Sequence, residues 1–322
     1  MKQNINSNFI PSNYMPILNE TIMSTGSKIF IGDEETSCRF CGRSHPDVSF
    51  KNVSHAIPEF IGNKRFILKS ECDTCNNFFS KNLEVHLDKY TKPYRIIAKI
   101  KGKNRIPNYK SKDKKTRINS NGNDVAHIIS PSDSKFINII PEKNTITNTY
   151  ELEAYIPSAV YKCLVKIGLS VLPKEEMINF KEAINWILCD NHSYNIITPL
   201  VLLQAYIPGF KPIKESFIKI LKKNEMVSTS PAYWLIIGFG NIVYQIMLPS
   251  ALDYKVNLDK QFTPLIYDES WPFGNVERNI KKLTSHEIVR GETLTINFSY
   301  DRLIEAPELI GKSFSELGIK YP

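Results

Sequence analysis

The sequence predicts an α+β fold, in which a small N-terminal module built around four cysteines precedes a mixed α+β domain with antiparallel strands. Two observations lead to this prediction. Two C-x-x-C pairs lie between residues 38 and 75, and the second half of the chain shows helical patterns followed by strand-like runs, an order typical of α+β domains. The 322 residues are enough for about two domains. We predict an N-terminal extension over 1–35, the cysteine module with a basic segment over 36–120, and the α+β domain over 121–322.

Composition and charge indicate a folded protein with a polyanionic partner. Hydrophobic residues make up 42% and charged residues 23%, which excludes disordered and low-complexity classes. Residues 1–150 carry 23 Lys and Arg against 14 Asp and Glu, whereas residues 151–322 carry 18 against 19. The whole basic excess therefore lies in the first half, and it points to a partner such as nucleic acid there.

The sequence also predicts a cytoplasmic protein with no membrane span. Its N-terminus has no apolar core of the length that a signal peptide needs. The longest uncharged stretch, Met226–Leu252, reads as two strands, Trp234–Phe239 and Ile242–Leu248, with a turn at Gly240-Asn241 between them. We therefore do not expect it to cross a bilayer.

Four of the six cysteines form the pairs Cys38/Cys41 and Cys72/Cys75. In a chain without an export signal, a reducing compartment disfavours disulfides. Two such pairs read most simply as a tetrahedral zinc site with four thiolate ligands. The other interpretations are a redox C-x-x-C, for which one pair between a strand and a helix suffices, and chance.

The loop between the two pairs contains residues suited to chemistry. It carries Ser54 and His55 in a Ser-His-Ala-Ile-Pro run and Asn63 after Gly62, and Asn76 directly follows the second pair. The segment before His55 (VSFKNVSH) alternates as a strand does, and residues from about 74 onward have apolar side chains near helical spacing. We predict a strand, a loop or second strand, and then a helix, held at the base by zinc.

The run CRFCG…SHAIPEFIGN…ECDTCNNFFS resembles the HNH endonucleases, also called ββα-metal nucleases, and among them the zinc-stapled subset with paired C-x-x-C motifs, over residues 36–90. The resemblance implies a ββα-metal fold and hydrolysis of DNA phosphodiester bonds. It makes His55 the general base, Asn76 a ligand of the catalytic Mg²⁺ or Mn²⁺, and Asn63 the nearest match to the middle asparagine of the family. Many members have Asp or Glu before the histidine as a second metal ligand, and here that position is Ser54, with Glu59 or Asn77 as other candidates.

This chemistry needs these residue types. Phosphodiester hydrolysis requires a base that deprotonates water and a cation that stabilises the negative charge on the phosphate. A neutral imidazole, with an ordinary pKa of ~6.5, suits the first task. Mg²⁺ prefers oxygen ligands, and an asparagine amide supplies one.

A basic segment follows the module. Residues 81–117 hold 13 Lys and Arg and only three acids, with Tyr90, Tyr94 and Tyr109 interleaved. We expect phosphate contacts from its basic side chains and base stacking by its tyrosines; the alternative is a solvated loop. The candidate DNA-binding residues are Lys101, Lys103, Arg105, Lys110, Lys112, Lys114, Lys115 and Arg117.

The second half shows secondary structure but no recognisable site. Two helices are predicted over 158–172 and 174–188, with Cys163 and Cys189 as buried thiols. Strands are predicted over 150–156, 195–207, 216–222, 234–239 and 242–248, and a hairpin over 287–290 and 293–300. No phosphate loop, dinucleotide fingerprint, second metal cluster or repeat is present in the sequence. By analogy, this half serves recognition, regulation or homodimerisation.

The sequence thus predicts a metal-dependent HNH endonuclease that acts on double- or single-stranded DNA, with structural Zn²⁺ and catalytic Mg²⁺ or Mn²⁺. The family resemblance suggests prokaryotic defence against phage or foreign DNA. Two alternatives remain open. One is a non-catalytic zinc module that binds nucleic acid, with the nuclease site decayed at Ser54. The other is a ligand-sensing or partner-docking protein in which the second half is the main agent.

Overall fold

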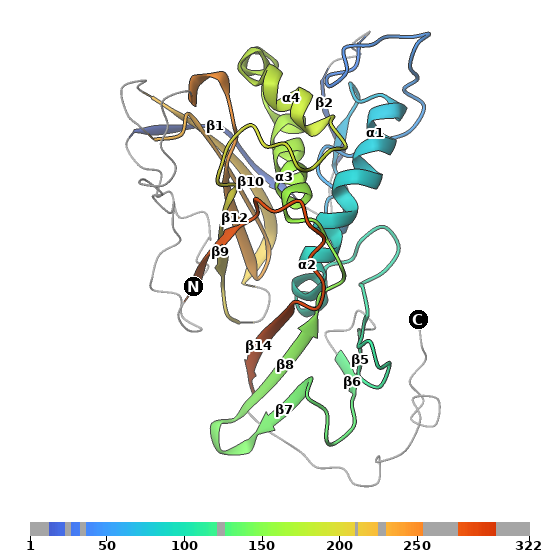
Figure 1. Cartoon of the computed structure of the whole chain (residues 1–322), viewed down its shortest axis with the longest axis vertical. Coiled ribbons are helices and arrows are strands. Elements are labelled where there is room, and N and C mark those ends of the chain that lie inside the picture. The colour runs from blue at the N-terminus through green and yellow to red at the C-terminus, as the bar shows by residue number, and fades with distance from the viewer. Residues whose placement is uncertain are drawn as a thin grey trace.

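The computed structural model describes residues 13–22, 27–32, 37–120, 126–209, 212–224, 230–253 and 276–300. They form a mixed α+β fold with mostly antiparallel sheets, which confirms the predicted fold class. The largest sheet has six strands in the order β1-β10-β11-β12-β9-β13 (Figure 1). These strands are β1 (Tyr14–Ile22), β9 (Val201–Tyr206), β10 (Ile213–Lys223), β11 (Tyr233–Gly240), β12 (Ile242–Met247) and β13 (Glu277–Lys282).

Both faces of this sheet are buried at its centre. Side chains alternate along a strand, so Trp234 and Ile236 of β11 join one buried cluster while Leu235 and Ile237 join another. The turn predicted at Gly240-Asn241 is confirmed. Gly240 has φ +60°, and a side chain there would collide with Ala98, so the tight turn requires glycine.

The edge strand β1 comes from the start of the chain. It pairs antiparallel with β10, so that Tyr14 lies opposite Lys223. Residues 14–22 therefore complete a sheet whose other strands all come from residues 201–282. The domain boundaries that we drew from the sequence stay a prediction.

Two long helical segments pack side by side. The first runs through α1 (Asp73–Phe79), a π-helical turn η2 (Ser80–Glu84) and α2 (Val85–Ile97). The second is α3 (Pro157–Val171), which lies between the large sheet and the first segment (Figure 1). Instead of the helix predicted over 174–188, a 3₁₀ segment (Lys174–Phe180) leads into the short helix α4 (Lys181–Ile187).

Smaller sheets complete the fold. One has the order β14-β8-β7, a second has the order β4-β5-β6, and the third is the parallel pair β2-β3. Their strands are β2 (Ile29–Ile31), β3 (Phe66–Leu68), β4 (Tyr109–Lys110), β5 (Arg117–Ser120), β6 (Ala126–Ile129), β7 (Ile137–Ile140), β8 (Thr145–Glu151) and β14 (Thr293–Ser299).

Two strand predictions in this region are wrong. Residues 287–290 form no hairpin with 293–300, because β14 pairs with β8 along its whole length. The backbone before β14 instead bonds to residues 152–155: the Leu152 amide donates to Glu292, and Tyr155 and Val289 exchange two bonds. The same contacts explain why β8 ends at Glu151, earlier than the predicted strand over 150–156.

Within the described residues, no helix has the length and apolar character needed to cross a membrane. The described part of the uncharged stretch 226–252 contains strands β11 and β12, as predicted.

Candidate active site

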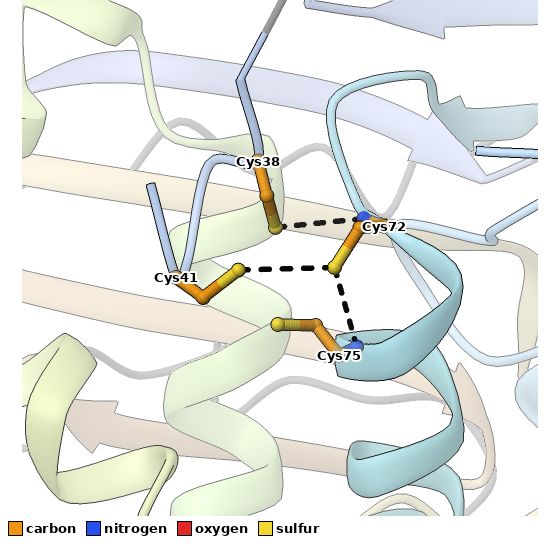
Figure 2. Close-up of side chains that lie close together, drawn as sticks. All are labelled: Cys38, Cys41, Cys72 and Cys75. Atoms are coloured by element: carbon orange, nitrogen blue, oxygen red, sulfur yellow. Dashed lines mark hydrogen bonds between the residues drawn. The ribbon is translucent and has the colours of Figure 1, made fainter. Parts of the chain in front are cut away.

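The four paired cysteines meet at one point, from two turns far apart in the chain (Figure 2). Their sulfur atoms all lie within 4.8 Å of one another, and the Sγ atoms of Cys41 and Cys72 are 3.8 Å apart. When four thiolates surround a tetrahedral zinc ion at Zn–S distances of about 2.3 Å, their sulfur atoms are separated by roughly the distance seen between Cys41 and Cys72. All four cysteines are free of disulfides. The predicted four-cysteine cluster is therefore confirmed, and its geometry fits zinc.

Local backbone contacts prepare this cluster for a metal. The Cys72 amide points at the sulfur of Cys38, and the Cys75 amide points at the sulfur of Cys72, each at 3.4 Å. The Cys75 thiol, as a hydrogen-bond donor, lowers the pKa of Cys38. The same contact raises the pKa of Cys75, and zinc binding displaces the proton that the two sulfurs share, since deprotonated thiols are the ligands of zinc.

The cluster fixes the start of helix α1 and the loop before His55. Cys72 is the N-cap of α1, and Asp73 is its first residue. The Asp73 carboxylate accepts bonds from the amides of Lys51 and Asn52 at 3.1 and 2.9 Å, and from the Ser49 hydroxyl at 2.5 Å. This anchoring explains why the strand predicted before His55 is wrong: the segment is bound to the helix end instead of to a neighbouring strand.

His55 lies in a short antiparallel ladder of backbone hydrogen bonds that precedes helix α1 in the chain. It forms an antiparallel bridge with Ile67 of β3, and the flanking bonds join Ala56 to Phe66 and Leu68 to Ser54. An isolated bridge at His55, strand β3 and helix α1 follow one another as a reduced form of the predicted ββα outline. The ladder is short because residues 49–52 are bound to the Asp73 carboxylate and not to strand β3.

The surroundings of the His55 imidazole favour its neutral form and leave the ring partly exposed to solvent. Its side chain is 23% exposed, and Nε2 lies 3.9 Å from Oε2 of Glu59. Nδ1 is buried and has no hydrogen-bond partner among the described residues. Burial lowers the pKa of His55 below its usual value, an effect that the Glu59 carboxylate opposes. At neutral pH the ring is therefore largely unprotonated and can accept a proton.

Asn63 holds the loop between the two extended segments. It is fully buried, and its amide nitrogen donates to the carbonyl oxygens of Ile57 and Phe66 at 2.6 and 3.1 Å. Its amide oxygen accepts from the backbone amides of Arg65 and Phe66, both at 2.9 Å. With both ends occupied by the backbone, Asn63 positions the loop that follows His55, and it does not itself face a substrate.

Asn76 and Ser54, the two proposed ligands of the catalytic cation, are placed differently. Asn76 is half-buried on α1, and its side chain makes no hydrogen bond within the described part of the chain. Ser54 is 2% exposed, and its hydroxyl donates to the Glu71 carbonyl at 3.4 Å. The burial of this hydroxyl and its bond to the protein interior argue against the ligand role predicted for Ser54.

The zinc cluster, the ββα outline and the buried asparagine follow one another in the order expected from the sequence. Residues 38–91 match the family model of the HNH endonucleases. The match begins at the first cysteine of the cluster, ends within α2, and includes His55, Asn63 and Asn76. No curated protein and no solved structure matches the chain. The predicted resemblance is thus confirmed for the HNH segment, by which we mean residues 38–91.

A buried lysine from the second half reaches the HNH segment. The Nζ atom of Lys166, on α3, lies 3.2 Å from Oε2 of Glu71, 3.5 Å from Oε1 of Glu84 and 3.5 Å from the backbone oxygen of His55. Lys166 and Glu71 are fully buried. Burial raises the pKa of Glu71 to about 7, although Lys166 acts against that shift. Arg39, next to the first cysteine, also donates to the carbonyls of Leu169 and Leu172 at the end of α3.

Sequence reasoning missed Lys166 and its partners, although a signal is present. Lys162 and Lys166, four residues apart, are the only charged residues of the otherwise largely apolar helix α3. A helix of that kind is expected to be buried, and buried lysines need partners. Lys162 donates to the backbone oxygens of Cys189 and Asn191, whereas Lys166 pairs with the two acids.

We expect Lys166→Met to destabilise the protein by about 3–5 kcal/mol, because it leaves the Glu71 carboxyl group buried without its cation. The measurement is the free energy of unfolding from urea denaturation. In the double variant with Glu71→Gln, most of that loss should be recovered, since no uncompensated buried charge remains. A double variant whose loss of stability equals the sum of the losses in the two single variants would show that the pair does not interact.

Proposed function

We propose that this chain is a metal-dependent endonuclease that hydrolyses DNA phosphodiester bonds, with His55 as the general base. The match of residues 38–91 to HNH endonucleases, together with a partly open, neutral histidine on the ββα ladder, carries the proposal. A bound Mg²⁺ or Mn²⁺ would polarise the scissile phosphate and stabilise the leaving oxygen. The half-buried Asn76 offers an oxygen suited to such a hard cation.

In this proposal, the residues around His55 divide the work. His55 takes the proton from the attacking water, and Glu59, 3.9 Å from Nε2, stabilises the imidazolium that results. The Nζ atom of Lys64 lies 2.8 Å from Oε1 of Glu59 and holds this carboxylate in place. Asn63 fixes the loop from which Glu59 and Lys64 extend.

The part of the basic segment that follows α2 lies beside this site. Lys64 also donates to the Gly102 backbone oxygen at 2.9 Å. Burial would raise the pKa of Glu59, but the positive charges of Lys64, His55 and Lys103 outweigh that effect and lower it, so Lys103 lies close to this carboxylate. The segment then continues into the hairpin of β4 and β5. Of the eight predicted DNA-binding residues, Arg117 is half-buried and the others are exposed: Lys101, Lys103, Arg105, Lys110, Lys112, Lys114 and Lys115. These positions would let a nucleic-acid backbone run from the hairpin to His55.

The structure does not support the stacking role expected for the tyrosines. Tyr90, Tyr94 and Tyr109 are each at most 6% exposed and belong to the hydrophobic core. Tyr90 and Tyr94 hydrogen-bond to Gln204 of the large sheet, and the Tyr109 hydroxyl accepts from the Glu151 amide. The tyrosines lie on the side of the segment that packs against the core, and most of the basic residues between them lie on the side that is exposed to solvent. The proposed binding therefore rests on phosphate contacts.

Replacing Lys112, Lys114 and Lys115 together by alanine should weaken duplex binding and reduce the slope of log affinity against log salt concentration by roughly 0.9 per lost phosphate contact. Cutting at saturating DNA should persist, because these residues bind and do not react. The measurement is affinity by fluorescence anisotropy between low and physiological salt. A matched control is Lys281→Ala with Lys282→Ala, two exposed lysines on β13. If the triple variant keeps the wild-type slope, the segment is only a solvated loop.

The function itself is tested by incubating zinc-loaded protein with supercoiled plasmid, single-stranded DNA and RNA, with Mg²⁺ or Mn²⁺ added or omitted. We expect metal-dependent cutting of DNA. A second candidate, a nucleic-acid-binding zinc module without activity, is favoured by the buried serine at the position before His55; it predicts binding without cutting. Roles in defence, a cytoplasmic location and homodimerisation stay predictions from the sequence.

A further inference from the structure

Strand β3 has an extended neighbour on each side, and one of them carries His55. Strand β2 pairs with β3 in parallel and places Phe30 opposite Ile67, while His55 bridges the same Ile67 from the other side. Paired residues of neighbouring strands have their side chains on the same face of a sheet. Phe30, Ile67 and His55 therefore form one row across this small sheet, and their side chains share one face.

The two faces of this sheet differ in exposure. Phe66 and Leu68 of β3 lie on the opposite face, where they are buried in the hydrophobic core. On the face that carries His55, Ile67 is buried, but the His55 side chain is 23% exposed and Phe30 is 54% exposed. Neighbouring strands are about 4.8 Å apart, so the backbones of Phe30 and His55 are separated by roughly 10 Å. An exposed phenyl ring thus lies close to the imidazole.

The charge around this ring is positive. Nζ of Lys69 lies 4.9 Å from the centroid of the Phe30 ring, within the range of a cation–π contact. Two more cations, Lys28 and Arg65, directly precede β2 and β3. These three cations occur without any acidic residue in the segments that build the sheet, which are residues 27–32, 53–56 and 65–69. A polyanion is therefore the partner that this surface favours.

An exposed aromatic ring beside positive charges suits unpaired nucleic acid in particular. Bases stack on such rings with little regard to sequence, and cations contact the neighbouring phosphates. Within a duplex each base is already stacked between its neighbours, so a phenyl ring reaches the face of a base only where the strand is unpaired or opened. The three tyrosines of the basic segment are buried and cannot stack in this way. Phe30 is exposed and shares a face with His55, so it can.

We propose that Phe30 and Lys69 form a binding site for an unpaired nucleotide of the substrate strand, close to the phosphate on which His55 acts. The Phe30 ring stacks on the base, and the Lys69 ammonium binds an adjoining phosphate. This inference rests on the proposed nuclease function, and it specifies the substrate as DNA that is single-stranded or locally opened at the cut.

The test is the affinity of the full zinc-loaded chain, without Mg²⁺ or Mn²⁺, for fluorescent probes of equal length: a dT oligonucleotide, a strand of abasic sugars and a duplex. Phe30→Ala should bind the dT probe about 5- to 150-fold more weakly, the usual loss for one stacked base, and should bind the abasic probe and the duplex like the wild type. Phe30→Trp should keep the preference for dT over the abasic strand. Lys69→Ala should reduce the salt slope on single strands by roughly 0.7.

Tyr194→Ala is the matched control, because it removes another exposed aromatic ring, 60% exposed, from a different part of the chain. It should bind every probe like the wild type. Zinc content and thermal melting show whether each variant is folded, as we expect for side chains that are exposed.

Two results would overturn the stacking site: wild-type affinity of folded Phe30→Ala for the dT probe, or equal binding of the dT and abasic probes by the wild type. If either is found while the wild type cuts DNA with metal, the nuclease proposal stands and only the role of Phe30 is wrong. If Phe30→Ala loses affinity for dT but the wild type cuts nothing with either metal, the binding site is supported and the nuclease proposal fails.

Discussion

Replacing His55 by alanine is expected to slow DNA cutting by about 10²–10⁴-fold, the usual cost of losing a general base. His55 contributes its imidazole to the site, while its backbone bridge to Ile67 does not depend on the side chain. The variant should therefore keep its fold, its zinc and its affinity for DNA. The measurement is the single-turnover rate of plasmid cutting at saturating protein.

The dependence on pH supplies a second readout for the same residue. The base must be unprotonated, and burial lowers the pKa of His55. The wild-type rate should therefore rise with pH through a value below about 6.5, the ordinary pKa of histidine, and be constant above it. His286→Ala, which removes a half-exposed histidine that is paired with Glu287, is the matched control and should leave both rate and profile unchanged. Undiminished cutting by the His55 variant would exclude it as the base.

Loss of the zinc site should have the largest effect on stability. The binding free energy of a structural zinc is folding free energy, about 10–16 kcal/mol in zinc-finger peptides at pH 7. Cys72→Ser or Cys38→Ser should therefore unfold much of the HNH segment and abolish cutting. Cys72 caps α1, and the same helix start anchors residues 49–52 before His55 through Asp73.

Metal analysis and hydrogen exchange measure this outcome. We expect about one zinc per wild-type chain, a loss of that zinc in the two variants, and rapid amide exchange over residues 38–91. Cys189→Ser is the matched control, because Cys189 is a half-buried free thiol outside the cluster. Full zinc content in Cys72→Ser would contradict the four-cysteine site.

The sequence predicts the local chemistry of the HNH segment well, for a physical reason. Zinc ligands, a histidine after a short extended run and an asparagine after the second pair are specified by spacing within about 40 residues, so short-range patterns are enough to find them. The four cysteines do converge. The hydrogen bonds that explain Asn63, by contrast, depend on a loop conformation that spacing does not reveal.

Contacts between distant parts of the chain could not be predicted in this way. Strand β1 pairs with β10 across 194 to 209 residues, and Lys166 reaches His55 from a helix that sequence patterns assign to a separate domain. Local periodicity carries no information about which elements meet. The burial of Ser54 and of the three tyrosines of the basic segment could not be predicted for the same reason, because it is decided by the elements that cover them.

The most direct test of the account is the single-turnover rate of plasmid cutting by zinc-loaded wild-type protein and by His55→Ala, each titrated with Mg²⁺ and with Mn²⁺. Metal is omitted in the zero point, since a chelator would also remove the structural zinc. We predict that wild-type cutting is absent without added metal and rises to saturation, while excess metal fails to restore the His55 variant. Wild-type cutting that does not depend on added metal, or full rescue of His55→Ala by metal, would contradict it.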